Sequence, residues 1–313
     1  MTATDTVTRH SEATAVGRPL RVFAWLSFLA EVLIIGTGGA VRLTGSGLGC
    51  PTWPTCTADS IVATPAMGIH GAIEFGNRTL TGLVGILALA VVYLVWRMRR
   101  ERRDLFVLSL IVLGGVVAQA IVGGITVLTG LNPFIVGFHY VASVTLVSVC
   151  AAFLYRLDRT PGSRELAVPR PYAILTHIGT LLLALTIAFG ILTTGAGPHS
   201  GDADAGRNGF NAELLEHVHA WPSYALFTVT LALVAVAWAK RLPTRTWITV
   251  LLALEVVQIA IGLYQARNGL PELAVGAHMV LAALLGAAMT LTVLSLKRPA
   301  SVRTAAPVEA ASV

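Results

Sequence analysis

Eight long apolar stretches constrain this chain more than any other feature. Each is close to the length of about twenty residues that an α-helix needs to cross the hydrocarbon core of a bilayer. They cover residues 21–41, 73–96, 105–128, 134–155, 172–194, 218–238, 246–265 and 273–296. Of the 313 residues, 55% are hydrophobic and 12% are charged, which excludes an ordinary soluble domain. The sequence therefore predicts an all-α polytopic membrane protein with eight transmembrane helices.

The basic residues are concentrated on one side of these predicted helices. Of the 22 Lys and Arg, 18 lie in one set of loops and tails, in runs such as "RMRRERRD" and "KRLPTR". The other four, on the opposite side, are Arg42, Arg78, Arg207 and Arg267. Because cytoplasmic segments carry the excess of Lys and Arg, both termini are predicted to be cytoplasmic. The net charge of +6 has the same origin, so we interpret the basic runs as topology signals and predict no nucleic-acid partner.

The second half of the chain repeats the first. The segment "QAIVGGITVLTGLNPFIVGFH" (119–139) aligns without a gap with "QIAIGLYQARNGLPELAVGAH" (258–278) and matches it in one Gln, three Gly, one Leu and the final His. Further upstream, "TGSG" pairs with "TGAG" and "EFGN" pairs with "EHVH". Each repeat unit contains four predicted helices, and an even number brings both units into the membrane from the same side.

We therefore expect two four-helix bundles related by a pseudo-twofold axis along the membrane normal. The first covers residues 21–160 and the second covers residues 171–297. A cytoplasmic tail (1–20) precedes them, and a disordered tail (298–313) follows.

Four polar residues occupy corresponding positions at the predicted outer ends of the even-numbered helices: Asn77, His139, His219 and His278. Imidazole is a good ligand for heme iron, and two His from neighbouring helices of a bundle can bind the metal from both faces. We therefore predict His219 and His278 as axial ligands in the second bundle. His139 has the same position in the first bundle, but there it is paired with Asn77. The alternative is that these His only pack and bond to the backbone.

Further polar residues precede or follow Asn77. Glu74 lies three residues before it, so the acid is one helical turn away on the same side. A carboxylate beside a heme can move protons, although an acid facing interfacial water is the alternative. Arg78 is a candidate contact for heme propionates. His70 shares the stripe of Glu74 and Asn77 if the helix extends outward.

Two cysteines flank a Pro-rich segment, "CPTWPTC", in the first outer loop. On the oxidising side of the membrane, Cys50 and Cys56 are predicted to form a disulfide. A structural clip is the simplest interpretation, and exchange with partner thiols is the alternative.

Taken together, these features resemble the heme A synthase family, membrane enzymes that convert heme O to heme A for terminal oxidases. The resemblance covers roughly residues 20–297 and rests on "GTGGAVRLTGSGLGCPTWP", "EFGNR", the two Gln-to-His blocks and "TTGAGPHSGD". It implies an oxidoreductase of the bacterial plasma membrane that oxidises the C8 methyl group of heme O through an alcohol to a formyl group. It also implies heme b iron between His219 and His278, an essential acid at Glu74, and a cysteine pair at Cys50 and Cys56. Heme O synthase and terminal oxidase assembly factors are the implied partners.

One position departs from the family pattern Glu-x-x-His-Arg, because Asn77 replaces the His. An amide is a poor iron ligand, so the substrate heme would be held by His139 alone or by His139 with His70. The first bundle would then leave a coordination position open, whereas the bis-His site would suit electron transfer. The alternative function is a diheme b-type cytochrome that carries electrons between quinol and a partner. Such a carrier would favour bis-His ligation in both bundles, and Asn77 counts against it.

Overall fold

The computed structural model describes residues 16–300, so most of both predicted tails lies outside the described residues. It contains eight helices that are long and apolar enough to cross a membrane, which confirms the predicted polytopic fold. The helices are α2 (Arg18–Leu43), α3 (Gly68–Trp96), α4 (Arg103–Leu128), α5 (Pro133–Leu157), α6 (Arg170–Ala196), α7 (Ala212–Ala239), α8 (Arg245–Arg267) and α9 (Glu272–Leu294).

Two helices extend outward well beyond their apolar stretches. A short 3₁₀ turn, η1 (Pro65–Met67), leads into α3, which begins at Gly68 rather than at residue 73. Helix α7 begins at Ala212 rather than at residue 218, and the Asn211 side chain caps it by accepting a hydrogen bond from the Leu214 N–H at 2.8 Å. Glu216, three residues before His219, is therefore helical, as Glu74 before Asn77 is.

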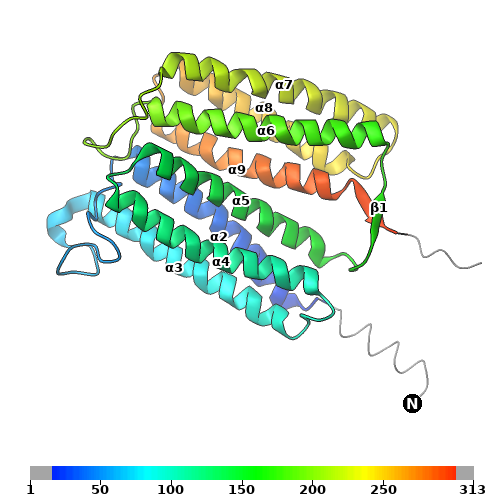
Figure 1. Ribbon diagram of the computed structural model, residues 1–313, viewed down its shortest axis with the longest axis horizontal. Coiled ribbons are helices and arrows are strands. Elements are labelled where there is room, and N and C mark those ends of the chain that lie inside the picture. The colour runs from blue at the N-terminus through cyan, green and yellow to red at the C-terminus, as the bar shows by residue number, and fades with distance from the viewer. Residues whose placement is uncertain (1–15, 301–313) are drawn as a thin grey trace, which may run out of the picture.

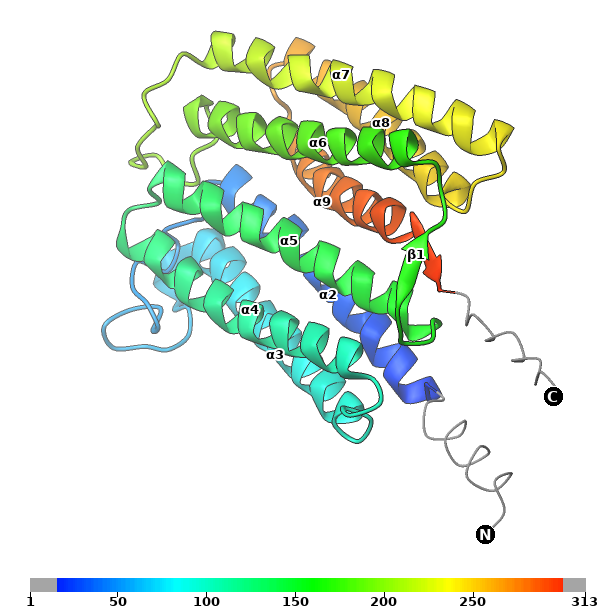
Figure 2. The ribbon, with the colours of Figure 1, turned by 45° about the vertical axis from the view of Figure 1, so that its right-hand side comes forward.

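Each group of four consecutive helices closes into a bundle. Helix α2 contacts α3, α3 contacts α4, α4 contacts α5, and α5 returns to α2. Helices α6 to α9 repeat this circuit, with α9 returning to α6. Figures 1 and 2 show the two groups as neighbouring layers, with α6 to α9 above α2 to α5.

The sequence repeat is also a repeat of local structure. After α4, Gly130 and Leu131 have φ of 61° and 59°, and after α8 the matching Gly269 and Leu270 have φ of 71° and 59°. A left-handed Leu is uncommon, so its occurrence at both matched positions shows the same turn built twice.

The two bundles pack together mainly through α5 and α9, with α2 also contacting α9. The core between them consists of small and branched side chains: Ile35, Val144, Val147, Ala151, Ala283 and Ala287. At its outer side the Tyr140 hydroxyl donates a hydrogen bond to the Met279 carbonyl at 2.7 Å. Tyr140 and Met279 are equivalent positions of the sequence repeat.

The opposite end of the molecule carries a feature that the sequence analysis does not predict. Strand β1 (Arg164–Leu166), in the connection between the bundles, pairs antiparallel with β2 (Lys297–Pro299), which follows α9. Figure 2 places this pair at the end of the molecule where α2 begins and α9 ends. The short sheet ties the connection between the bundles to the end of the last helix.

Candidate functional site

A cavity of about 750 Å³ lies between the two bundles and receives side chains from all eight helices. It runs from the outer loops, at Pro198 and Leu270, to Glu31 and Glu255 near the middle of α2 and α8. Its lining is mainly apolar, and its volume falls in the range of roughly 300–1,000 Å³ typical of small-molecule sites. Asn77, His139, His219 and His278 all line it, so the structure brings the predicted constellation to one cavity.

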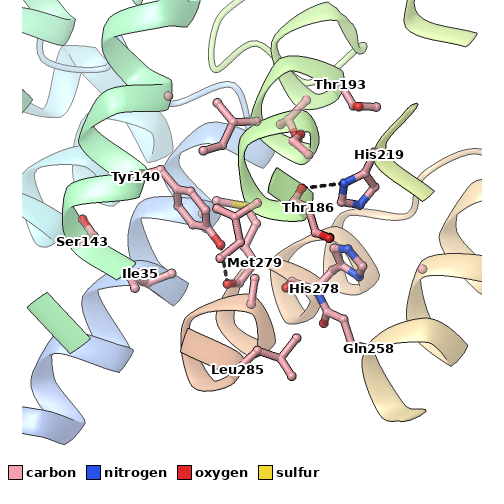
Figure 3. A pocket seen from close by; sticks show the side chains of 18 of the residues that line it. Ile35, Tyr140, Ser143, Thr186, Thr193, His219, Gln258, His278, Met279 and Leu285 are labelled. Atoms are coloured by element: carbon pink, nitrogen blue, oxygen red, sulfur yellow. Dashed lines mark hydrogen bonds between the residues drawn. The ribbon is translucent and has the colours of Figure 1, made fainter. Parts of the chain in front are cut away.

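His219 and His278 lie close to each other in the lining of this cavity (Figure 3). Their ring centres are 6.3 Å apart and the ring planes meet at 69°. The Nδ1 atom of His219 donates a hydrogen bond to the Thr186 carbonyl at 2.8 Å, which leaves Nε2 free for a ligand. The backbone carbonyl of His278 accepts a hydrogen bond from Gln258 at 3.1 Å. The His278 Nδ1 is buried and has no partner among residues 16–300.

The spacing of this pair fits a metal held between two imidazoles. With metal–nitrogen distances of about 2 Å and about 1.2 Å from each nitrogen to its ring centre, the ring centres would be about 6.4 Å apart. Within the described part of the chain, no group of three or more His, Cys, Asp or Glu is placed to hold a metal ion. His219 and His278 would be the two protein ligands of an iron porphyrin, whose macrocycle supplies the other nitrogen ligands.

The first bundle presents a single imidazole in the equivalent place. Gln119 donates to the His139 carbonyl at 2.8 Å, as Gln258 does to His278. Gly123 lies beside the His139 ring, where a Cβ atom would come within 3.4 Å of Cε1. Asn77 also lines the cavity, and its Oδ1 accepts a hydrogen bond from the Thr37 hydroxyl at 2.7 Å. The first bundle thus has His139 and the Gln119 side chain that supports it, but it has the Asn77 amide in place of a second imidazole.

Glu74 and Arg78 are not among the residues that line the cavity. The Arg78 Nη2 contacts the Glu74 carboxylate at 2.5 Å, and the backbone N–H of Cys50 donates to the same carboxylate. Arg78 also donates to the carbonyls of Cys50, Thr52 and Thr55, at 2.9 to 3.2 Å. The two side chains hold the first outer loop against α3.

The cysteines of that loop, Cys50 and Cys56, form the predicted disulfide. The helix does extend outward to include His70, the condition for His70 to share the stripe of Glu74 and Asn77. However, His70 does not line the cavity either. Its Nδ1 lies 2.9 Å from the Ser46 hydroxyl, so the structure places it in the packing of the outer loops.

Three residues that line the cavity were not predicted as site residues from the sequence. Glu31 and Glu255 are 2% and 3% exposed. Glu255 accepts a hydrogen bond from Thr230 at 2.8 Å, whereas Glu31 Oε1 has no partner within residues 16–300. Arg42 is the third, at the outer end of α2. The available signal was its position, two residues before the start of the "TGSG" segment that recurs in the second half.

Fold and cavity together define the class: a polytopic membrane protein of two four-helix bundles with imidazoles facing a common apolar cavity. A family model described as cytochrome oxidase assembly protein, COX15-CtaA, matches residues 21–199. Since this is more than half of the chain, the chain belongs to that family. The matched range contains Glu74, Asn77 and His139 but ends before His219 and His278.

Several relatives carry the name heme A synthase. The chain is 32% identical to that of Staphylococcus saprophyticus over 177 residues, which is 54% of this chain and 57% of the relative. It is 26% identical to that of Halalkalibacterium halodurans over 182 residues, 57% of this chain and 59% of the relative. For Listeria welshimeri the identity is 26% over 55% of this chain and 58% of the relative. The matches thus span less than two thirds of these relatives.

Proposed function

We propose that this protein is a heme A synthase, an oxidoreductase that oxidises the C8 methyl group of heme O to a formyl group by successive hydroxylation. The observation that carries the proposal is the unequal pair of sites in one cavity. One bundle offers two imidazoles at the spacing of an axial pair, and the other offers one imidazole and an amide. A diheme electron carrier with two equivalent heme sites would not need one site to have an amide in place of an imidazole.

The second bundle is the proposed resident-cofactor site. His219 and His278 would hold heme b, which when bound supplies one-electron transfer. The Thr186 carbonyl keeps the proton of His219 on Nδ1 and directs Nε2 toward the cavity. Gln258 donates to the backbone of the turn that carries His278 and so supports the second imidazole.

The first bundle is the proposed substrate site. His139 would hold the substrate heme O, and Asn77, fixed by the Thr37 hydroxyl, would leave the opposite side without a second strong ligand. The apolar cavity wall would exclude water from the reacting methyl group. Glu74 remains the proposed catalytic carboxylate: it lies one turn from Asn77, just outside the cavity lining, and Arg78 and the Cys50 N–H define its position.

The proposed setting is the bacterial plasma membrane with both termini in the cytoplasm. Eight apolar helices support a multi-pass protein, and the basic loops support this orientation. A heme O synthase that delivers the substrate and terminal oxidase assembly factors that receive the product are the proposed partners.

The test is the pigment of the purified full chain and its product in cells. We expect heme b together with heme O or heme A by pyridine hemochrome and chromatographic analysis. Glu74→Gln should retain heme but lose at least about 100-fold in heme A formation, the scale of a lost general acid or base. Glu272→Gln is the matched control, because this acid is exposed at the outer start of α9 and outside the cavity.

Two results would contradict the proposal. Two heme b per chain, with no heme O or heme A, would favour the diheme electron carrier. Heme A formation at the wild-type level in Glu74→Gln would remove Glu74 from the mechanism.

A further inference from the structure

Arg42 places an uncompensated positive charge on the wall of the cavity. Among residues 16–300 it is the only Lys or Arg that lines the cavity. Arginine does not lose its proton in proteins, so this charge persists at every working pH. The ion pairs of the described residues involve Arg21, Arg78, Arg102 and Arg298, and none involves Arg42.

The guanidinium of Arg42 is held in place by neutral acceptors of the other bundle. Its Nε donates to the His199 carbonyl at 2.7 Å, and its Nη2 donates to the Thr194 carbonyl at 2.9 Å. His199 is itself fixed, because its Nε2 donates to the Leu270 carbonyl at 3.0 Å. The third nitrogen, Nη1, has no hydrogen-bond partner in the part of the chain that the structure describes. It is not one of the fully buried atoms without a partner, so a ligand can reach it. The two N–H groups of Nη1 therefore remain available.

The surroundings define what this donor would bind. Arg42 lies at the outer end of the cavity, near Gly197 and Pro198, whereas the wall below it is mainly apolar. A half-buried charge that keeps only carbonyl partners is stabilised most by an anion in the same low-dielectric site. Glu31, Glu213, Glu216 and Glu255 line the cavity too, but none of them forms an ion pair with Arg42 in the described residues. The ligand itself is the remaining source of negative charge.

We propose that Arg42 binds a carboxylate of the ligand in this cavity, so that the ligand lies with its acidic edge outward and its apolar body between the bundles. This inference rests on the proposed function, in which the ligand is a heme with two propionates. It assigns to Arg42 the role that the sequence analysis gave to Arg78, whose donors are taken by Glu74 and the outer loop. Because Arg42 belongs to α2 and its acceptors belong to the second bundle, the contact also joins the two bundles.

The experiment varies the charge on both partners. The full chain in detergent, freed of pigment by transfer to apomyoglobin, is titrated with heme b and with heme b dimethyl ester, and binding is followed by absorbance. We expect wild type to bind the ester about 10- to 100-fold more weakly than the free acid, the scale of a charge-assisted hydrogen bond. Arg42→Gln should bind both ligands equally, at about the wild-type affinity for the ester. Arg42→Lys should retain part of the preference, because it keeps the charge but not the planar fork.

Arg267→Gln is the matched control, an exposed Arg on the same side of the membrane that does not line the cavity. It should keep the wild-type preference for the acid. Equal binding of acid and ester by wild type, or an unchanged preference in Arg42→Gln, would overturn the proposal. A purely structural role of Arg42 would weaken acid and ester alike and would also overturn it. If the preference depends on Arg42 but no heme A forms from heme O, only the proposed function fails.

Discussion

At the scale of single residues, the two bundles differ most at one position of the repeat. Asn77 and His219 occupy equivalent places, and each is held by a residue of the preceding helix in its own bundle. The Thr186 carbonyl accepts a hydrogen bond from His219, and the Thr37 hydroxyl donates one to Asn77. A hydroxyl can also accept, so Thr37 could hold the Nδ1–H of an imidazole in the same way. Thr37 is thus placed to support an imidazole in the first bundle, where the chain carries Asn77 instead of His.

This leads to a prediction for Asn77→His. We expect a new six-coordinate, low-spin heme signal in addition to that of the second bundle, measured by electron paramagnetic resonance and absorption of the purified protein. The physical reason is that the new imidazole would face the cavity on the side opposite to His139. Combining it with His139→Ala should remove the new signal and leave that of the second bundle unchanged. An unaltered spin state in Asn77→His would mean that the two bundles do not share site geometry.

At the scale of elements, the first outer loop is closed on itself by its disulfide and held against α3 by the charged side chains of Glu74 and Arg78. Glu74 is 5% exposed, and Arg78 gives it a compensating charge while binding three carbonyls of the loop. Glu74 and Arg78 lie four residues apart on one face of α3, so both side chains reach the same loop. The polar start of this helix therefore has a structural role alongside its proposed chemical one.

The pair can be tested by a double-mutant cycle on stability. Arg78→Gln should lower the free energy of unfolding by about 3 kcal/mol, because it leaves the buried Glu74 carboxylate without its compensating charge. Glu74→Gln combined with Arg78→Gln should recover part of the loss, since no unpaired buried charge remains. Thermal unfolding of the detergent-solubilised protein provides the measurement. Equal melting temperatures for the single Arg78→Gln variant and wild type would show that the pair contributes nothing to stability.

At the scale of the whole molecule, hydrophobicity and the internal repeat were enough to predict the fold from the sequence. They were not enough to predict every residue of the site. Hydropathy locates the interior of each helix but not the capped, polar first turns, so the starts of α3 and α7 lay several residues outside the predicted stretches. Periodicity within one bundle cannot show which residue reaches the other bundle. For that reason the sequence predicts Arg78 as the propionate contact and does not single out Arg42, which lines the cavity and donates hydrogen bonds to the Thr194 and His199 carbonyls of the second bundle.

The orientation of the whole molecule gives the last prediction. Asp204 is exposed in the connection between α6 and α7, and Ser163 is exposed in the connection between α5 and α6, at the opposite end. Since the basic residues gather on the side of Ser163, a membrane-impermeant maleimide should label Asp204→Cys in intact cells and Ser163→Cys only after permeabilisation. The parent chain is a suitable background, because Cys150 is buried and Cys50 and Cys56 are paired.

The reverse labelling pattern would contradict more than the predicted topology. It would place the Cys50–Cys56 disulfide in the cytoplasm, where thiols are kept reduced. The loop that Arg78 and Glu74 hold against α3 would then lack its covalent closure, and the end of the cavity at Arg42 would face the cytoplasm. The basic loops and the disulfide are independent physical arguments, and they agree on one orientation, with the Arg42 end of the cavity on the outer side.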